Sequence, residues 1–199
     1  MRYRQLCAGA ALAAGVVFVM PAPAAFAGDG WVDELKFGVL KHDISLFGDS
    51  TESGVDVNGE VRFHALDWFA SKDNPEWLND ILAPRPDIGG SLNTSGHTDF
   101  VYAGLVWTWD VAHNLFQPKD GMYIDFGFGG ALNDGHLNDA PPGDKDFGSR
   151  GLFHLQGELG YRFDPTWSLS AYYDHYSNAG LAHPNPGINN VGLRVGYSF

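Results

Sequence analysis

Two polar residues near the C-terminus have the types and the spacing for ester hydrolysis. His175 and Ser177 are separated by a single residue. In a β-strand, side chains two positions apart point to the same side of the sheet. An imidazole beside a hydroxyl can remove the hydroxyl proton and so activate the oxygen for attack on an ester. The spacing therefore predicts a nucleophilic pair, provided that this segment ends a strand.

A third polar residue can complete this pair from the following strand. Asn189 falls on the same alternating face as Val191 and Leu193. If the two strands are antiparallel neighbours, Asn189 can lie beside His175 and fix the tautomer of the imidazole. The simpler alternative is that His175 and Ser177 only hydrogen-bond water or lipid head groups at a membrane surface.

Apolar residues that recur at every second position predict the strands that carry these polar residues. A short amphipathic helical turn is expected within residues 65–83, at the periplasmic end, and a long loop over residues 133–149. The expected strands cover residues 35–41, 55–63, 88–93, 100–109, 122–128, 153–163, 167–174 and 191–199.

The polar faces of these segments carry charges that can pair with each other inside a narrow barrel, whereas the apolar faces carry aromatic residues near strand ends. We therefore predict an all-β fold, an eight-stranded antiparallel transmembrane β-barrel. The tight turn at Asp164-Pro165 is expected on the periplasmic side, which places residues 175–177 in the outer leaflet. The charges expected inside are Glu60, Arg62, Asp125, Glu158, Arg162 and Arg194.

The N-terminus has the pattern of an export signal. Arg2 and Arg4 precede a mostly apolar stretch, and the small-x-small sequence at residues 25–27 is typical of a cleavage site. We expect a signal peptide at residues 1–27 and one barrel domain at residues 28–199, in the bacterial outer membrane. No long apolar run follows residue 27, so a helical membrane protein is excluded. The single cysteine, Cys7, lies within the predicted signal.

Composition excludes several other functions. The formal net charge is −12, whereas nucleic-acid binding favours a basic face. The acidic loop around His136 does not have the spacing of a calcium loop, and no phosphate-binding loop or Cys/His metal site is present. We therefore expect no metal and no cofactor.

The C-terminal region resembles a known enzyme family. Residues 175–180, 185–187 and 192–199 resemble the C-terminal block of the lipid A 3-O-deacylases, and residues 153–160 and 86–91 do so more weakly. Members of that family are eight-stranded outer-membrane barrels that remove the 3-position hydroxyacyl chain of lipid A without a cofactor. The resemblance thus implies a serine esterase whose substrate is lipid A, within lipopolysaccharide.

By position in the family pattern, His175 would be the general base and Ser177 the nucleophile. Asn185 and the backbone amides around Ala179 and Gly180 would hold the oxyanion. One position departs from the pattern, because the family has an acid fourteen residues after the histidine and this chain has Asn189 there.

Two rival functions fit the sequence less well. The first is a non-catalytic outer-membrane barrel with a structural or adhesion role, which the missing carboxylate at residue 189 would favour. The second is a soluble, lipocalin-like periplasmic binder. The sequence leaves open whether the protein forms a homodimer in the outer-membrane lipid.

Overall fold

The computed structural model describes residues 30–46 and 48–199. The predicted signal peptide, residues 1–27, lies outside the described residues and stays a prediction. In chain order the elements are β1 (Val32–Lys41), β2 (Val55–Phe63), α1 (Glu76–Leu82), β3 (Arg85–Asn93), β4 (Phe100–His113), β5 (Gly121–Asn133), β6 (Gly151–Arg162), β7 (Trp167–Ser177) and β8 (Ile188–Ser198).

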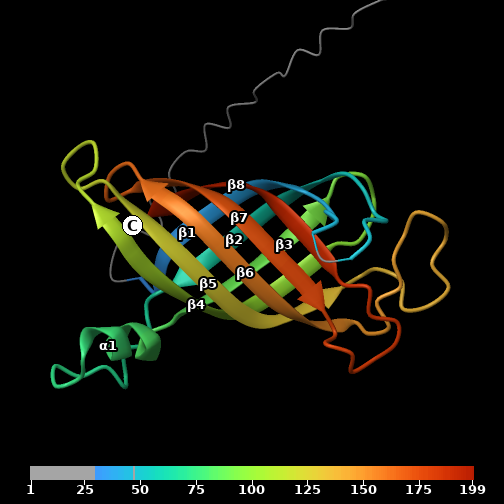
Figure 1. The fold of residues 1–199 in the computed structure, drawn as a ribbon, viewed down its shortest axis with the longest axis horizontal. Helices are drawn as coiled ribbons and strands as arrows, with labels where there is room; N and C mark the ends of the chain where they lie inside the picture. The colour runs from blue at the N-terminus through green and yellow to red at the C-terminus, as the bar shows by residue number, and fades with distance from the viewer. Residues whose placement is uncertain (1–29, 47) are drawn as a thin grey trace, which may run out of the picture.

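The strands form one closed barrel in which each strand pairs with its neighbours in the sequence (Figure 1). β8 also pairs antiparallel with β1, from Ser198 opposite Glu34 to Val191 opposite Lys41, and this pairing closes the sheet. Closure pairs the backbone on both sides of every described strand, which is what hydrocarbon requires of a spanning sheet. The prediction of an eight-stranded antiparallel barrel is confirmed.

The outer surface of the barrel is strongly apolar. Val39, Val57, Val101, Leu159 and Leu193 project from five different strands, and each exposes half or more of its surface. A soluble protein seldom exposes a continuous apolar band of this kind, whereas a transmembrane barrel turns such a band towards lipid. The lipocalin-like alternative is wrong, because its apolar side chains would line the inside of the barrel.

Buried charges fill the middle of the interior. The Arg62 guanidinium contacts Glu60 at 2.6 Å, Asp125 at 2.5 Å and Glu158 at 3.0 Å. Arg194 contacts Glu60 at 2.8 Å. Each of these ions is fully or almost fully buried, so their opposite charges replace the water that each of them gives up. Five of the six charges predicted for the interior therefore lie together there.

The sixth predicted charge, Arg162, is on the same inward face of β6, with its guanidinium over the buried Tyr123 ring, but outside the central cluster. It lies at the end of β6, where it is partly exposed and pairs with Asp110. An interior cation that the sequence did not predict is Lys36, whose Nζ contacts Glu158 Oε1 at 2.5 Å. Its strand was only imperfectly alternating, because Gly38 interrupts the inward face on which Lys36 lies.

The interior is apolar and aromatic at the end of the barrel where β7 stops, which the sequence predicts to lie in the outer leaflet. The Tyr176 ring stacks on Phe100 at 4.0 Å and on His154 at 4.6 Å between ring centroids. The same buried cluster also contains Tyr102, Ala131, Phe147, Leu152 and Ile188. This packing lies directly behind the end of β7 and fixes which side chains of that strand point inwards.

The connections divide between the two ends of the barrel. One end, to the right in Figure 1, carries residues 42–46, 48–54, 94–99, 134–150 and 178–187. The other end carries residues 64–84, 114–120 and 163–166. The tight turn and α1 therefore share an end, as predicted. Among the described residues, no helix is long and apolar enough to cross a membrane.

Several strands are longer than the sequence predicted. β5 continues to Asn133 rather than ending at residue 128, and β4 continues to His113 rather than residue 109. Gly129 and Gly130 have no side chains with which to extend the apolar alternation. The sequence pattern therefore does not show that β5 continues beyond residue 128. β2 has the predicted bounds.

The buried ion cluster predicts a large effect of one substitution. Arg62→Met leaves Glu60, Asp125 and Glu158 without their shared cation, and removal of one partner from such a buried group costs about 3–5 kcal/mol. We expect that loss in the free energy of unfolding, measured by urea titration of the protein in lipid vesicles. Arg162→Met is the control and should change stability by less than about 1 kcal/mol, because its ion pair is exposed. Equal losses in both variants would contradict this account of the interior.

Candidate active site

The predicted catalytic residues lie on two adjacent antiparallel strands. β7 and β8 are in continuous register from Trp167 opposite Tyr197 to Tyr176 opposite Ile188. In that register His175 is directly opposite Asn189. The alternation along β7 turns Asp174 and Tyr176 inwards and leaves His175 on the outer, lipid-facing side.

One hydrogen bond joins the imidazole to the amide across the two strands. His175 Nδ1 lies 2.8 Å from Asn189 Oδ1. An amide oxygen only accepts, so Nδ1 must carry the proton. In the neutral imidazole the other ring nitrogen, Nε2, then has a lone pair and can accept a proton. This is the tautomer that a general base needs.

A tyrosine that the sequence did not single out also contacts this amide. The Tyr173 hydroxyl donates to Asn189 Oδ1 at 2.7 Å. The oxygen thus receives two donors, which together define its direction, and Asn189 itself is buried. The signal for Tyr173 was present in the sequence, because it shares the odd-numbered face of His175 and precedes it by two residues.

Ser177 is the last residue of β7 and shares the outer face with His175. Its Cα is about 6.6–6.8 Å from that of His175, the distance that two residues span along a strand. Both side chains are half-buried. On its other side Ser177 is paired with Phe153 of β6. The hydroxyl therefore lies at the rim, where the wall of the barrel meets the outer loops.

The loop after Ser177 folds around one buried side chain. Asn178 Nδ2 donates to the carbonyl oxygens of Phe147 and Pro184, and the backbone amide of Asn178 donates to Asn185 Oδ1 at 2.9 Å. Asn178 Oδ1 accepts from the backbone amide of Gly180, also at 2.9 Å. These bonds hold the start and the end of the loop against the rim.

These bonds bear on the predicted oxyanion donors. The Gly180 amide already donates to Asn178 Oδ1. It can donate to an oxyanion only if that hydrogen bond breaks. Asn185 uses its oxygen within the loop, and its side-chain amide group is the part that can donate outwards. Ala179 and Gly180 both adopt positive φ angles, of 53° and 78°, which turn the chain sharply at this point. The oxyanion roles of Asn185, Ala179 and Gly180 stay predictions.

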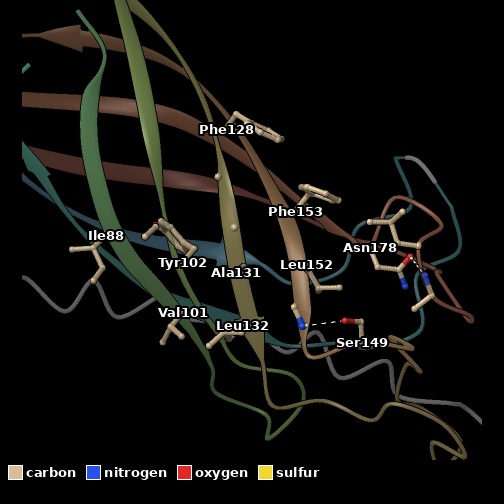
Figure 2. A pocket seen from close by; sticks show the side chains of 16 residues that line it. Ile88, Val101, Tyr102, Phe128, Ala131, Leu132, Ser149, Leu152, Phe153 and Asn178 are labelled. Carbon is tan, nitrogen blue, oxygen red and sulfur yellow. Dashed lines mark hydrogen bonds between the residues drawn. The ribbon is translucent and has the colours of Figure 1, made fainter. Parts of the chain in front are cut away.

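An apolar groove runs along the outside of the barrel beside Ser177. It has a volume of about 780 Å³. Figure 2 shows Val101 and Leu132 along it, Phe128 and Phe153 above, and the loop residue Asn178 at one end. Its floor is low because the outward positions 130 and 151 are glycines. Ser177 does not line the groove itself, but its strand partner Phe153 and the next residue, Asn178, both do, so the groove ends one residue from Ser177.

A second, smaller apolar hollow of about 360 Å³ lies against the imidazole, over β5, β6 and β7. His175, Tyr173, Leu155 and Phe126 line it, together with Gly157. Among the described residues, no group of three or more His, Cys, Asp or Glu side chains is placed to hold a metal ion. The site thus offers a base, a hydroxyl and apolar channels.

Comparison with known proteins agrees with this geometry. The family model described as lipid A 3-O-deacylase (PagL) matches residues 66–198, which include both strands of the site. The chain belongs to this family. The lipid A deacylase PagL of Bordetella bronchiseptica is 34% identical over 78 residues, which are 39% of this chain and 42% of that protein. The match therefore spans less than half the length of this curated relative.

A solved structure shares the fold of the family. The outer membrane enzyme PagL, known from a crystal structure, superposes with a TM-score of 0.60 and 21% sequence identity. The match covers 83% of this chain and 99% of that chain. The protein therefore has the eight-stranded fold of an outer-membrane barrel, as the sequence predicted.

A polar network lies under the outer loops of this barrel. His42 Nδ1 lies 2.8 Å from Asp56, and His42 Nε2 lies 2.9 Å from Glu52. Burial alone would lower the pKa of His42, but these two carboxylates raise it to about 9. Burial alone would raise the pKa of Glu52, but hydrogen bonds from His42 and from the Lys145 backbone amide lower it. The charged imidazole therefore ties the loop at residues 42–54 to β2.

The stability of the barrel should depend on the charge of His42. Because its folded pKa is raised above the ordinary value of 6.5, its contribution is fully present below that pH and is lost as the pH rises through about 9. We expect the melting temperature in detergent to fall by about 5 °C between pH 6.5 and pH 10. His42→Gln should melt lower at pH 6.5 and lose most of this pH dependence. The same pH dependence in both proteins would contradict the assignment.

Proposed function

We propose that this protein is an outer-membrane serine esterase that hydrolyses the 3-O-linked acyl chain of lipid A. The observation that carries the proposal is the His175–Asn189 hydrogen bond on the lipid-facing side of the barrel, beside Ser177. A polar group of this kind is expensive next to lipid, and such groups are usually functional. Membership of the family and the name of the Bordetella relative support lipid A as the substrate.

In the proposed reaction the ester bond is broken in two steps. The Ser177 oxygen attacks the ester carbonyl carbon while His175 Nε2 takes the hydroxyl proton. The resulting tetrahedral intermediate collapses, and the imidazolium returns the proton to the departing sugar oxygen. Water then attacks the acyl-serine with the same base, which releases the fatty acid and restores the hydroxyl.

The groove beside Ser177 supports an acyl substrate. Its walls are apolar, and its glycine floor leaves room for an alkyl chain lying along the barrel. A chain placed there is held by apolar contact, while its ester end reaches the rim. Side-chain amide hydrogens of Asn185 are proposed to stabilise the oxyanion, together with backbone amides at Ala179 and Gly180.

The amide at residue 189 should limit the rate rather than abolish it. In a serine protease, replacing the triad aspartate by asparagine lowers kcat by about 10⁴-fold, and the wrong imidazole tautomer contributes to that loss. Here the amide oxygen accepts from Nδ1, so the correct tautomer is preserved. What Asn189 lacks is the full negative charge that stabilises an imidazolium.

The first test removes the nucleophile and the base separately. Ser177→Ala and His175→Ala should each lower kcat by at least about 10³-fold, because either change removes the whole covalent route. The measurement is the 3-hydroxy fatty acid released from lipid A by the purified protein in detergent. Ser170→Ala is the matched control, since Ser170 lies on the same strand but points inwards. Unchanged release by either active-site variant would remove the mechanism.

The second test restores a carboxylate at residue 189. Asn189→Glu should raise kcat by about tenfold or more, because the charge stabilises the imidazolium that forms in the transition state. Asn189→Ala should lower kcat by about 10–100-fold, since it loses the group that orients the ring. Release of fatty acid is measured as above. If Asn189→Glu is slower than the natural protein, the proposed role of this residue is wrong.

The second candidate function is a non-catalytic barrel with a structural or adhesion role. The specific observation in its favour is again Asn189, where the family has an acid. Treatment with a serine-reactive phosphonate that carries a lipid tail distinguishes the two candidate functions. Phosphonylation of Ser177 that His175→Ala prevents supports the esterase, whereas absence of labelling in the natural protein supports the non-catalytic barrel.

A further inference from the structure

A buried lysine lies behind the catalytic segment, on a loop with no part in the chemistry described so far. Lys145 belongs to the connection between β5 and β6, and only 4% of its side chain is exposed. Its Nζ donates to Asp43 Oδ1 at 2.6 Å and to the carbonyl oxygen of Gly187 at 2.9 Å. The cation therefore joins three outer loops, those at residues 42–54, 134–150 and 178–187.

The carbonyl that Lys145 holds belongs to a residue packed against the catalytic imidazole. A Cβ added at Gly187 would lie 3.1 Å from His175 Cε1, so the Gly187 backbone approaches the ring closely. Gly187 has a φ angle of 64°, a conformation that favours glycine. A shift of this peptide would consequently move one wall of the space in which the imidazole sits.

The other partner of Lys145 is fixed to the start of β8. The Asp43 amide donates to Asn190 Oδ1 at 2.9 Å, and the Ile44 amide donates to the Asn189 carbonyl oxygen at 2.7 Å. Asp43 Oδ2 accepts from the amides of Thr51 and Glu52 at 2.6 and 2.9 Å. Residues 43 and 44 are thus held by their own loop while they hold residues 189 and 190.

We infer that Lys145 is a positioning residue for the esterase, which sets the place of the His175–Asn189 pair by holding Gly187 and Asp43. The inference rests on the function proposed above. Lys145 itself does not touch the imidazole and takes no proton in the reaction. Its effect passes through the Gly187 carbonyl on one side and through Asp43 to residues 189 and 190 on the other.

A side chain that only joined the three loops would not need to be a cation. Burial of an ammonium group carries a large desolvation penalty, which a single carboxylate offsets only with good geometry. An apolar side chain in the same space would join the loops without that penalty. What the ammonium adds is a directed donor to one backbone carbonyl, at the residue that lies against the imidazole.

The experiment compares Lys145→Met with the charge-balanced double variant Lys145→Met/Asp43→Asn, both in the full-length protein in detergent. Asn at residue 43 keeps an oxygen for the Thr51 and Glu52 amides and removes the unpaired charge. In both variants we expect kcat to fall about 10–100-fold, because small misplacements of catalytic groups have effects of that size. KM should stay within about twofold, since the groove is untouched.

A second readout does not depend on activity. The His175 Cε1–H resonance, identified by its loss in His175→Gln, should shift in both Lys145 variants because the Gly187 peptide lies against that atom. Arg85→Met is the control: Arg85 pairs with Asp33 and Glu34 at the opposite end of the barrel, so it should alter neither kcat nor this resonance.

The outcomes separate the inference from the proposed function. Recovery of kcat in the double variant would mean that the loss arose from the unpaired Asp43 carboxylate, and this would overturn the inference. An unchanged His175 resonance in the double variant would also overturn it. If the natural protein releases no fatty acid, the proposed function fails, and the resonance alone then decides whether Lys145 positions the ring.

Discussion

The register between β7 and β8 is the constraint on which the rest of the site depends. It sets His175 opposite Asn189 and turns both away from the interior. A slip of one residue would turn the imidazole and the Ser177 hydroxyl into the barrel. Tyr176 resists such a slip, because its ring is stacked between Phe100 and His154 inside. The aromatic packing at the outer end of the interior therefore helps to hold the site on the outer face.

The interior and the exterior of the barrel use polar groups in different ways. Inside, Arg62 and Arg194 share the carboxylates of Glu60 and Glu158, so the charges satisfy one another at fixed distances. On the outside, apolar side chains dominate, and His175 stands out among them. Its position at the rim lowers the penalty of placing it beside lipid, because water and head groups are near. The same position suits an ester that joins an acyl chain to a sugar.

The sequence predicted most of the barrel because alternation is a local signal. β2 matched its predicted bounds, and the odd-numbered face of β7 was assigned to lipid correctly. The pairing of His175 with Asn189 followed from that face and from an antiparallel return. The continuation of β5 through Gly129 and Gly130 to Asn133 was missed, since a residue without a side chain contributes nothing to the pattern.

The loops were less predictable for a different physical reason. Lys145 lies in a segment rich in Asp, Pro and Gly that has no periodicity, and its partners Asp43 and Gly187 are far away in the sequence. Nothing local marks the hydrogen bond from Asn178 Nδ2 to the Phe147 carbonyl oxygen either. Contacts of this kind depend on how separate loops meet above the barrel, which no single segment encodes.

The central claim is that the outward-facing residues of β7 and β8 cut an ester of lipid A. The most direct measurement is the mass of lipid A from cells of a lipopolysaccharide-making host with and without this protein. We expect a new species that is lighter by one 3-hydroxyacyl chain, and its absence when residue 177 is alanine. Lipid A of unchanged mass, although the folded barrel is present in the outer membrane, would contradict the account.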